Sequence, residues 1–116
     1  MLYYPSMSSH VADSDPLLAE AVRRLVAEFA PRRIYLFGSR ARGDEGADSD
    51  YDLLLLVGSG DGPRYTLARR AHELLWGLGI SVDILFWSEE AFDSRTHLRA
   101  SLPAVVLREG RLLHAA

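Results

Sequence analysis

The stretch from Ile34 to Val57 limits most strongly what this chain can fold into. It contains two short apolar runs, Ile34–Phe37 and Leu53–Val57, separated by a polar segment that begins with glycine and serine. Runs of this length, bounded by turn residues, are typical of buried strands. Apolar residues on both faces of the second run favour a central strand that is covered on each side. The sequence therefore predicts two strands of one sheet, joined by a polar connection.

Helix caps, periodicity and glycines define the remaining elements that we expect. Asp15 and Pro16 form a helix start, with aspartate as the cap and proline in the first turn. Ser88 can cap a short helix in the same way. The full expectation is helices over 15–30, 64–78 and 96–108, a helical turn after Gly38, a loop over 43–49, and strands over 33–37, 50–57, 81–87 and 111–114. Residues 1–14 read as an irregular segment, and 15–116 as the folded domain.

Composition excludes several classes of protein. The chain has 116 residues, enough for one domain with a real core, and a net charge of -3, which argues against a general nucleic-acid binder. All 13 basic residues are arginine, so the lysine of a P-loop is missing, and the lack of cysteine excludes disulfides and thiolate metal sites. No apolar run is long enough for a membrane span and no signal pattern opens the chain, so we expect a cytoplasmic protein without a membrane partner.

Two aspartates stand at the start of the second strand. Asp50 and Asp52 are two residues apart, so their side chains would leave the same side of the strand. Paired carboxylates repel each other unless a cation lies between them. Carboxylate oxygens suit Mg²⁺, which takes few protein ligands and completes its octahedron with water and phosphate oxygens. We therefore predict that these two residues bind metal, with two ions able to serve a phosphoryl or nucleotidyl transfer.

The turn after the first strand carries groups that suit phosphate. Gly38 has no Cβ and lets a ligand approach the backbone closely. Ser39 offers a hydroxyl and a backbone N–H at the start of a helical turn. Arg42 lies three residues after Ser39, so its guanidinium returns to the same face and could hold a second phosphate group. We predict that these three residues bind a nucleotide.

A third carboxylate is expected on a neighbouring strand. Asp83 is the only charge in the apolar run 81–87, and a buried unpaired carboxylate there would be costly. Asp83 is therefore our candidate for a third catalytic and metal-binding residue, which would orient the attacking hydroxyl.

Each of these residues also has a plainer interpretation. The aspartate pair could be a solvated strand entrance, and Asp83 could pair with an arginine. Ser39 could be an ordinary turn residue, and Arg42 a solvated surface charge. We favour the site interpretation because the whole pattern occurs in order.

That pattern carries a resemblance. Gly-Ser, ten residues, Asp-x-Asp and a later Val82-Asp83-Ile84 resemble the DNA polymerase β-type nucleotidyltransferase superfamily. Within it, GSRARG followed by SDYDLLLLV is most similar to the minimal nucleotidyltransferases, which include the MntA-type antitoxins paired with HEPN ribonuclease toxins. The resemblance implies an α/β (α+β) fold, with one small domain and a mixed sheet flanked by helices.

The resemblance also implies an activity and a partner. It assigns metal binding and catalysis to Asp50, Asp52 and Asp83, and nucleoside triphosphate binding to Gly38, Ser39 and Arg42. Antitoxins of this kind transfer AMP from ATP, with Mg²⁺, to a tyrosine hydroxyl of the HEPN-type toxin and so silence it. Two alternatives stay open: transfer to a small molecule or an RNA end, with a separate helical subunit that binds the acceptor, and an antitoxin that acts by binding alone.

Overall fold

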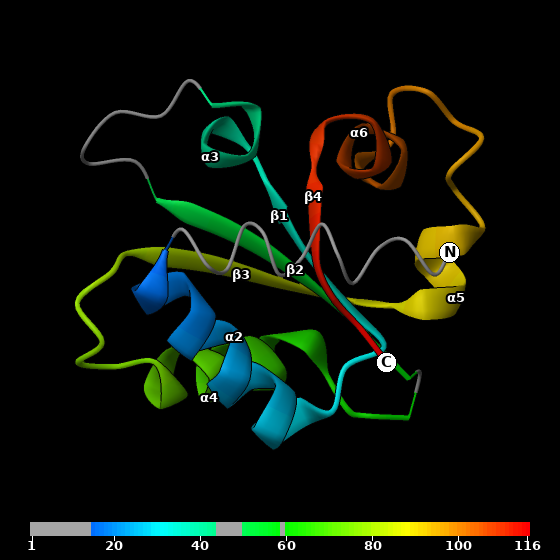
Figure 1. Cartoon of the computed structure of the whole chain (residues 1–116). Helices are drawn as coiled ribbons and strands as arrows, with labels where there is room; N and C mark the ends of the chain where they lie inside the picture. Colours follow the sequence, from blue (N-terminus) through cyan, green and yellow to red (C-terminus); the bar gives the residue numbers. More distant parts are fainter. Residues whose placement is uncertain (1–14, 44–49, 59) are drawn as a thin grey trace.

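The computed structural model describes residues 15–43, 50–58 and 60–116 (Figure 1). The expected irregular segment 1–14 and most of the expected loop 43–49 lie outside the described residues. Four strands form one sheet in the order β3-β2-β1-β4: β1 (Arg33–Phe37), β2 (Tyr51–Val57), β3 (Val82–Ser88) and β4 (Arg111–Ala115). β2 and β3 are parallel, whereas β1 pairs antiparallel with both β2 and β4. The expected mixed sheet is confirmed, with β2 in its interior and β4 at an edge.

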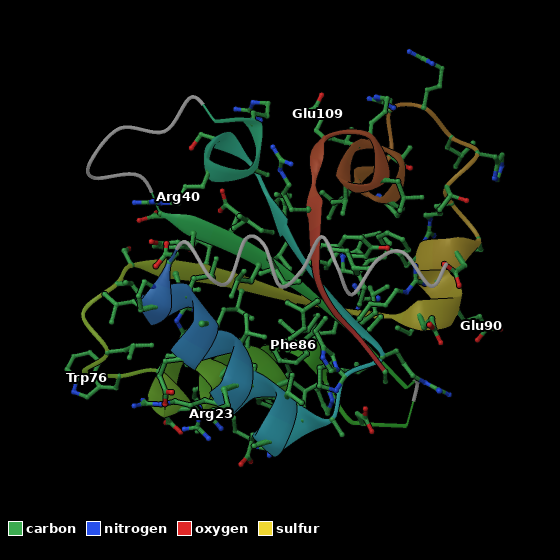
Figure 2. All side chains as sticks on the ribbon, viewed as in Figure 1. Arg23, Arg40, Trp76, Phe86, Glu90 and Glu109 are labelled. Carbon is green, nitrogen blue, oxygen red and sulfur yellow. The ribbon has the colours of Figure 1, made fainter. Side chains whose placement is uncertain are left out.

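One face of the sheet is covered by two long helices, α2 (Pro16–Phe29) and α4 (Arg64–Leu74) (Figure 1). α2 begins as expected, because the carboxylate of Asp15 accepts a hydrogen bond from the Leu18 N–H at 3.1 Å. Alternate residues of β2, among them Leu53 and Leu55, are fully buried against these helices. Figure 2 shows Phe86 of β3 between the sheet and this helix pair.

The other face carries shorter helices: α3 (Ser39–Arg42), α5 (Glu89–Asp93) and α6 (Leu102–Glu109). Leu54 and Leu56 of β2 are buried on this face, in a cluster with Phe92 of α5 and Val106 of α6. β2 is therefore buried from both sides beyond its first residues, as the unbroken apolar run predicts. No helix in the described part of the chain is long and apolar enough to cross a membrane.

Two helix predictions were wrong in their bounds. α4 ends at Leu74 and not at 78, because the chain turns through Gly77 and Gly79, which both have positive φ. The last helix begins at Leu102 and not at 96, because the Ser101 side chain caps it by accepting a hydrogen bond from the Ala104 N–H at 3.2 Å.

One expected core residue was wrong as a consequence. The segment 96–101 forms turns instead of helix, so Leu98 does not face the core and is 48% exposed. Proline in the first turn of α6, Pro103, explains why the helix starts so late. The division of the chain into an N-terminal segment and a domain from residue 15 stays a prediction.

Candidate active site

Strand pairing places two of the predicted acidic residues next to each other. β2 and β3 are parallel, and Asp52 pairs directly with Asp83. Paired residues of neighbouring strands project from the same face of a sheet, so both carboxylates lie on the side that carries α3 and α6. Asp50 precedes Asp52 by two residues, just before β2 begins, and is exposed like Asp83. The structure thus brings the three predicted carboxylates to one end of one sheet face, although their roles stay predictions.

The pKa of Asp52 reports how these charges act on each other. Its pKa is raised above the ordinary value, first by partial burial of the carboxyl group and then by the negative charges of Asp83 and Asp50. The positive charge of Arg42 acts in the opposite direction. Asp52 is therefore the centre of the group, and a cation held there would relieve a repulsion that already exists.

The donor set fits a divalent cation that keeps water and substrate oxygens among its ligands. Within the described residues, no group of three or more acidic, histidine or cysteine side chains is arranged as a ready-made metal site. Mg²⁺ does not require such a cage, since it usually binds through one or two carboxylates together with phosphate oxygens. Asp52, with Asp83 beside it and Asp50 at the strand entrance, supplies oxygen ligands of this kind. The structure places the three carboxylates at one end of one sheet face, and their meeting around metal stays a prediction.

Gly38 is required by its contact with Asp52. β1 ends at Phe37, which pairs with Asp52, and the next residue turns the chain with φ 75° and ψ -158°. That backbone conformation is essentially restricted to glycine. A Cβ at Gly38 would lie 2.2 Å from Oδ2 of Asp52, which is far inside contact distance. The absence of a side chain at Gly38 therefore leaves the space that the central carboxylate occupies.

The short helix α3 carries the other predicted nucleotide-binding residues. Ser39 is its first residue and is partly buried. Arg42 is its last residue, and its Nη1 lies 3.7 Å from Oε1 of Glu109 on α6. Both side chains of this ion pair are more than 40% exposed, so the pair contributes little to stability and can be exchanged for another anion. Arg42 thus pairs with Glu109, and its positive charge also acts on the carboxylate of Asp52.

The sequence did not predict the contacts that Tyr51 makes on the face of the sheet opposite to the carboxylates. Tyr51, the first residue of β2, lies between Asp50 and Asp52 in the sequence and projects to the opposite face, where it is buried and its hydroxyl donates to Asp15, the cap of α2. The guanidinium of Arg40 lies 4.0 Å from the centroid of the Tyr51 ring. Arg40, also labelled in Figure 2, had no assigned role. Strand alternation could have indicated the inward direction of Tyr51, but no sequence signal indicates its two partners.

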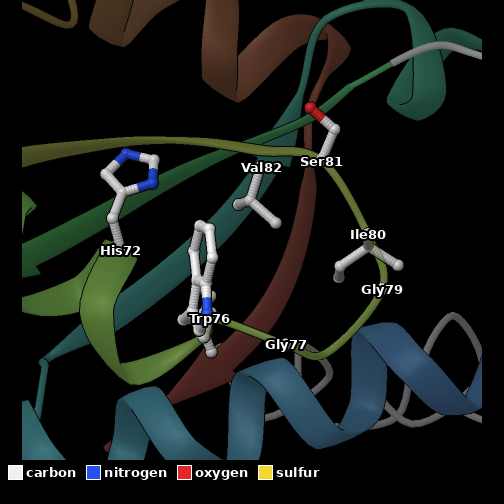
Figure 3. A pocket seen from close by; sticks show the side chains of 8 residues that line it. His72, Trp76, Gly77, Gly79, Ile80, Ser81 and Val82 are labelled. Atoms are coloured by element: carbon white, nitrogen blue, oxygen red, sulfur yellow. The ribbon is translucent and has the colours of Figure 1, made fainter.

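A large hollow near the site does not contain the carboxylates. It has a volume of about 570 Å³ and is lined by the end of α4, the turn that follows and the start of β3 (Figure 3). Trp76 stands in it with 87% of its surface exposed. Val82 lines the hollow and alternates in direction with Asp83, so the hollow opens on the α2/α4 side of the sheet. It is therefore separate from the acidic site.

Comparison with known proteins agrees with this geometry. The family model described as a nucleotidyltransferase domain matches residues 17–112. A Methanocaldococcus jannaschii protein, named as a putative protein adenylyltransferase, is 32% identical over 104 residues, which cover 88% of this chain and 99% of that protein. The chain belongs to the nucleotidyltransferase domain family. It is a nucleotidyltransferase, and the family resemblance inferred from its motifs is confirmed.

Solved structures give the same fold. A Sulfolobus solfataricus protein, named as a putative nucleotidyltransferase, has a TM-score of 0.55 and 27% identity, over 68% of this chain and 70% of that one. A toxin–antitoxin complex with AMP-PNP has a TM-score of 0.50 and 23% identity, over 84% of this chain and 73% of that one. The polymerase β-like fold class implied by the motifs is thereby confirmed.

Proposed function

We propose that this nucleotidyltransferase transfers AMP from ATP to a hydroxyl group of a partner protein, with tyrosine as the acceptor residue. The observation that carries the proposal is the pairing of Asp52 with Asp83 on adjacent strands, with Gly38 leaving room for the carboxylate of Asp52. The protein acceptor is supported by the name of the Methanocaldococcus jannaschii relative, which the chain covers almost completely. ATP as donor is supported by the AMP-PNP in the toxin–antitoxin structure of the same fold.

The roles of the residues follow from their positions. Asp50, Asp52 and Asp83 would hold Mg²⁺, and Gly38, Ser39 and Arg42 would bind the triphosphate. Two Mg²⁺ ions, when bound, neutralise the triphosphate and stabilise the charge on the attacking and leaving oxygens. The exposed pair of Arg42 with Glu109 would open, so that the guanidinium can contact a phosphate oxygen.

The transfer itself is a displacement at the α-phosphorus. The acceptor hydroxyl oxygen forms a bond to that phosphorus, and the bond from the phosphorus to the oxygen shared with the β-phosphate breaks. Pyrophosphate leaves with the electron pair of the broken bond. Asp83, at the exposed start of β3, orients the acceptor and takes the hydroxyl proton. The protein partner that we propose is a HEPN-type ribonuclease toxin, which the added AMP would silence, so the chain would act as an antitoxin.

The test is transfer of label from α-labelled ATP in the presence of Mg²⁺, with the protein encoded beside this chain as acceptor. Asp50→Asn combined with Asp52→Asn should reduce labelling to background without lowering the melting temperature, because the change removes repelling charges. Glu73→Gln, a neutralised carboxylate at an exposed position of α4, should label like the parent.

Other outcomes would contradict the proposal in distinct ways. Label on an RNA end or a small molecule, and none on protein, would replace the acceptor but keep the chemistry. Neutralisation of the toxin that survives the double substitution, without nucleotide turnover, would mean that the protein acts by binding alone.

A further inference from the structure

The acidic site continues into a row of side chains along β3. Asp83, Leu85 and Trp87 alternate with residues of the other face, so all three project on the side that carries the carboxylates. Their partners in β2 on this face, Asp52, Leu54 and Leu56, confirm the common direction. From Asp83 to Trp87 the row extends about 13 Å, at the usual rise of a strand.

The residue in the middle of this row, Leu85, is exposed to solvent, although its neighbours in β2 are apolar and buried. Leu54 and Leu56 are fully buried, yet Leu85, which pairs with Leu54, is 42% exposed. The helices of this face therefore cover the side chains of β2 but leave Leu85 accessible on the edge strand. The side chain presents an apolar contact between the carboxylates and Trp87.

Two arginines stand over the far end of the row. The guanidinium of Arg64, at the start of α4, lies 5.4 Å from the centroid of the Trp87 ring, and that of Arg95, just after α5, lies 5.7 Å from it. Both residues are exposed. The ion pairs between described residues all involve other arginines, namely Arg23, Arg24, Arg32, Arg33, Arg42 and Arg70. Two positive charges thus lie within about 6 Å of one ring centroid, and neither has a carboxylate partner in the described part of the chain.

This concentration of positive charge is notable in a chain whose net charge is -3. Two exposed guanidinium groups near one ring, neither of them paired with a carboxylate among the described residues, attract an anion placed near them. Because arginine on an aromatic face still directs N–H groups outward, Arg64 and Arg95 can bind a carboxylate while they stack on Trp87.

We propose that the row Asp83–Leu85–Trp87, with Arg64 and Arg95, is the docking surface for an acidic segment of the acceptor protein. This inference rests on the protein acceptor proposed above. The acceptor hydroxyl lies at Asp83, an apolar side chain of the segment lies on Leu85, and acidic side chains of the segment pair with the guanidinium groups of Arg64 and Arg95. The acceptor is thus recognised by an acidic side chain about four residues of extended chain away from the modified hydroxyl.

A binding experiment tests this surface without any transfer reaction. Trp76 and Trp87 are the two tryptophans of the chain, so in a Trp76→Phe background the tryptophan fluorescence reports Trp87 alone. The probe is poly-L-glutamate, titrated at low ionic strength, with poly-L-lysine and polyuridylate as comparisons. We expect a saturable change in Trp87 emission with poly-L-glutamate and none with poly-L-lysine.

Charge reversal then locates the binding. Arg64→Glu with Arg95→Glu should weaken poly-L-glutamate binding about tenfold or more, since two favourable contacts become repulsive. Arg64→Lys with Arg95→Lys keeps the charge and should bind within a few-fold of the parent. The matched control is Arg69→Glu, a reversal at another exposed position of α4, and it should leave the affinity unchanged.

Two outcomes would overturn the inference. Poly-L-glutamate binding that the double reversal leaves intact would place the contact elsewhere, and polyuridylate binding as tight as poly-L-glutamate binding would make the surface a site for RNA. Because fluorescence needs neither ATP nor metal, these failures are distinguishable from failure of AMP transfer. If the docking surface and the AMP transfer to a protein are both correct, the double reversal should raise the KM for the acceptor and leave the KM for ATP unchanged.

Discussion

The two faces of the sheet differ in what their covering helices leave exposed. On one face α2 and α4 lie along the strands, and Phe29 of α2 meets Phe86 of β3 with ring centroids 5.0 Å apart. The ion pair of Arg70 with Glu28 further joins the two helices. On the other face the helices are short and leave Asp52, Asp83 and Leu85 partly or largely exposed. The first face is closed by apolar contact, whereas the second is open where like charges gather.

Within one sheet, the closed face contributes most to stability and the open face carries the groups of the proposed active site. Burial of apolar surface on the closed face stabilises the fold in proportion to the area removed from water. On the open face the pKa of Asp52 is raised, first by partial burial of its carboxyl group and then by the charges of Asp83 and Asp50, and such a local cost is typical of functional sites. Because β2 contributes alternate residues to both faces, the closed face holds the strand in place while the open face carries the charges.

The largest expected effect compares one leucine from each face. Leu55 is fully buried against α2 and α4, so Leu55→Ala should lower the free energy of unfolding by about 2–5 kcal/mol. Leu85 is 42% exposed on the open face, and Leu85→Ala should cost less than about 1 kcal/mol. Urea unfolding of both variants measures the difference. Equal losses would mean that the open face carries as much of the core as the closed one.

A smaller effect is expected at the two glycines that bracket α3. Gly38→Ala should cost about 1–3 kcal/mol because of its backbone conformation, and its Cβ would also displace the carboxylate of Asp52. Gly43 also has positive φ, 82°, but a Cβ there meets no atom within 4 Å. Gly43→Ala should therefore cost about 1–2 kcal/mol.

Activity distinguishes the two glycine variants more sharply than stability does. Transfer of label from ATP should fall strongly in Gly38→Ala, where the central carboxylate is displaced. It should stay near the parent rate in Gly43→Ala, measured at a temperature where both variants are folded. Equal activities would contradict the assignment of Gly38 as the residue that makes room for Asp52.

Local signals predicted most of the fold and the placement of the acidic residues. Residues close together in the sequence predicted four local features, and the structure confirms them. These are the Asp15 cap, the strand that ends at Phe37, the glycine turn and the central apolar strand. Asp83 could be chosen as the third acidic residue because it is the one charge in its strand. The parallel register that pairs the two residues is a tertiary fact, which the motif implied only through the family resemblance.

The features that could not be predicted from the sequence depend on competing local signals or on contacts between distant residues. The leucine spacing after 96 is helical, but the Ser101 cap and Pro103 define a later start, and Leu98 is left outside the core. The stacking of Arg40 on Tyr51 joins residues that only the folded sheet brings together. The same holds for Arg64 and Arg95, which are far apart in the chain and both lie near the ring of Trp87.

The smallest expected effect is the pH dependence of stability that the carboxyl group of Asp52 causes on the open face. Because the pKa of Asp52 is raised, by burial and then by its acidic neighbours, the native state binds this proton more tightly than the unfolded state. The cost of the charged carboxylate is therefore fully present above the raised pKa and disappears as the pH falls to the ordinary value of about 3.9. Asp52→Asn should thus be more stable than the parent at pH 7, by about a few tenths of a kcal/mol at this partly exposed position.

The measurement is the difference in melting temperature between Asp52→Asn and the parent, followed from pH 7 downwards. The difference should shrink as the pH falls, and Mg²⁺ at pH 7 should raise the melting temperature of the parent alone, because only the parent keeps the carboxylate that the cation would bind. Asp93→Asn, which removes an exposed partner of Arg33 at 2.7 Å instead of a repelling charge, should melt no higher than the parent. If Asp52→Asn melts lower than the parent at pH 7, then the Arg42 charge outweighs the neighbouring carboxylates, and the open face is no longer a place where like charges lower stability.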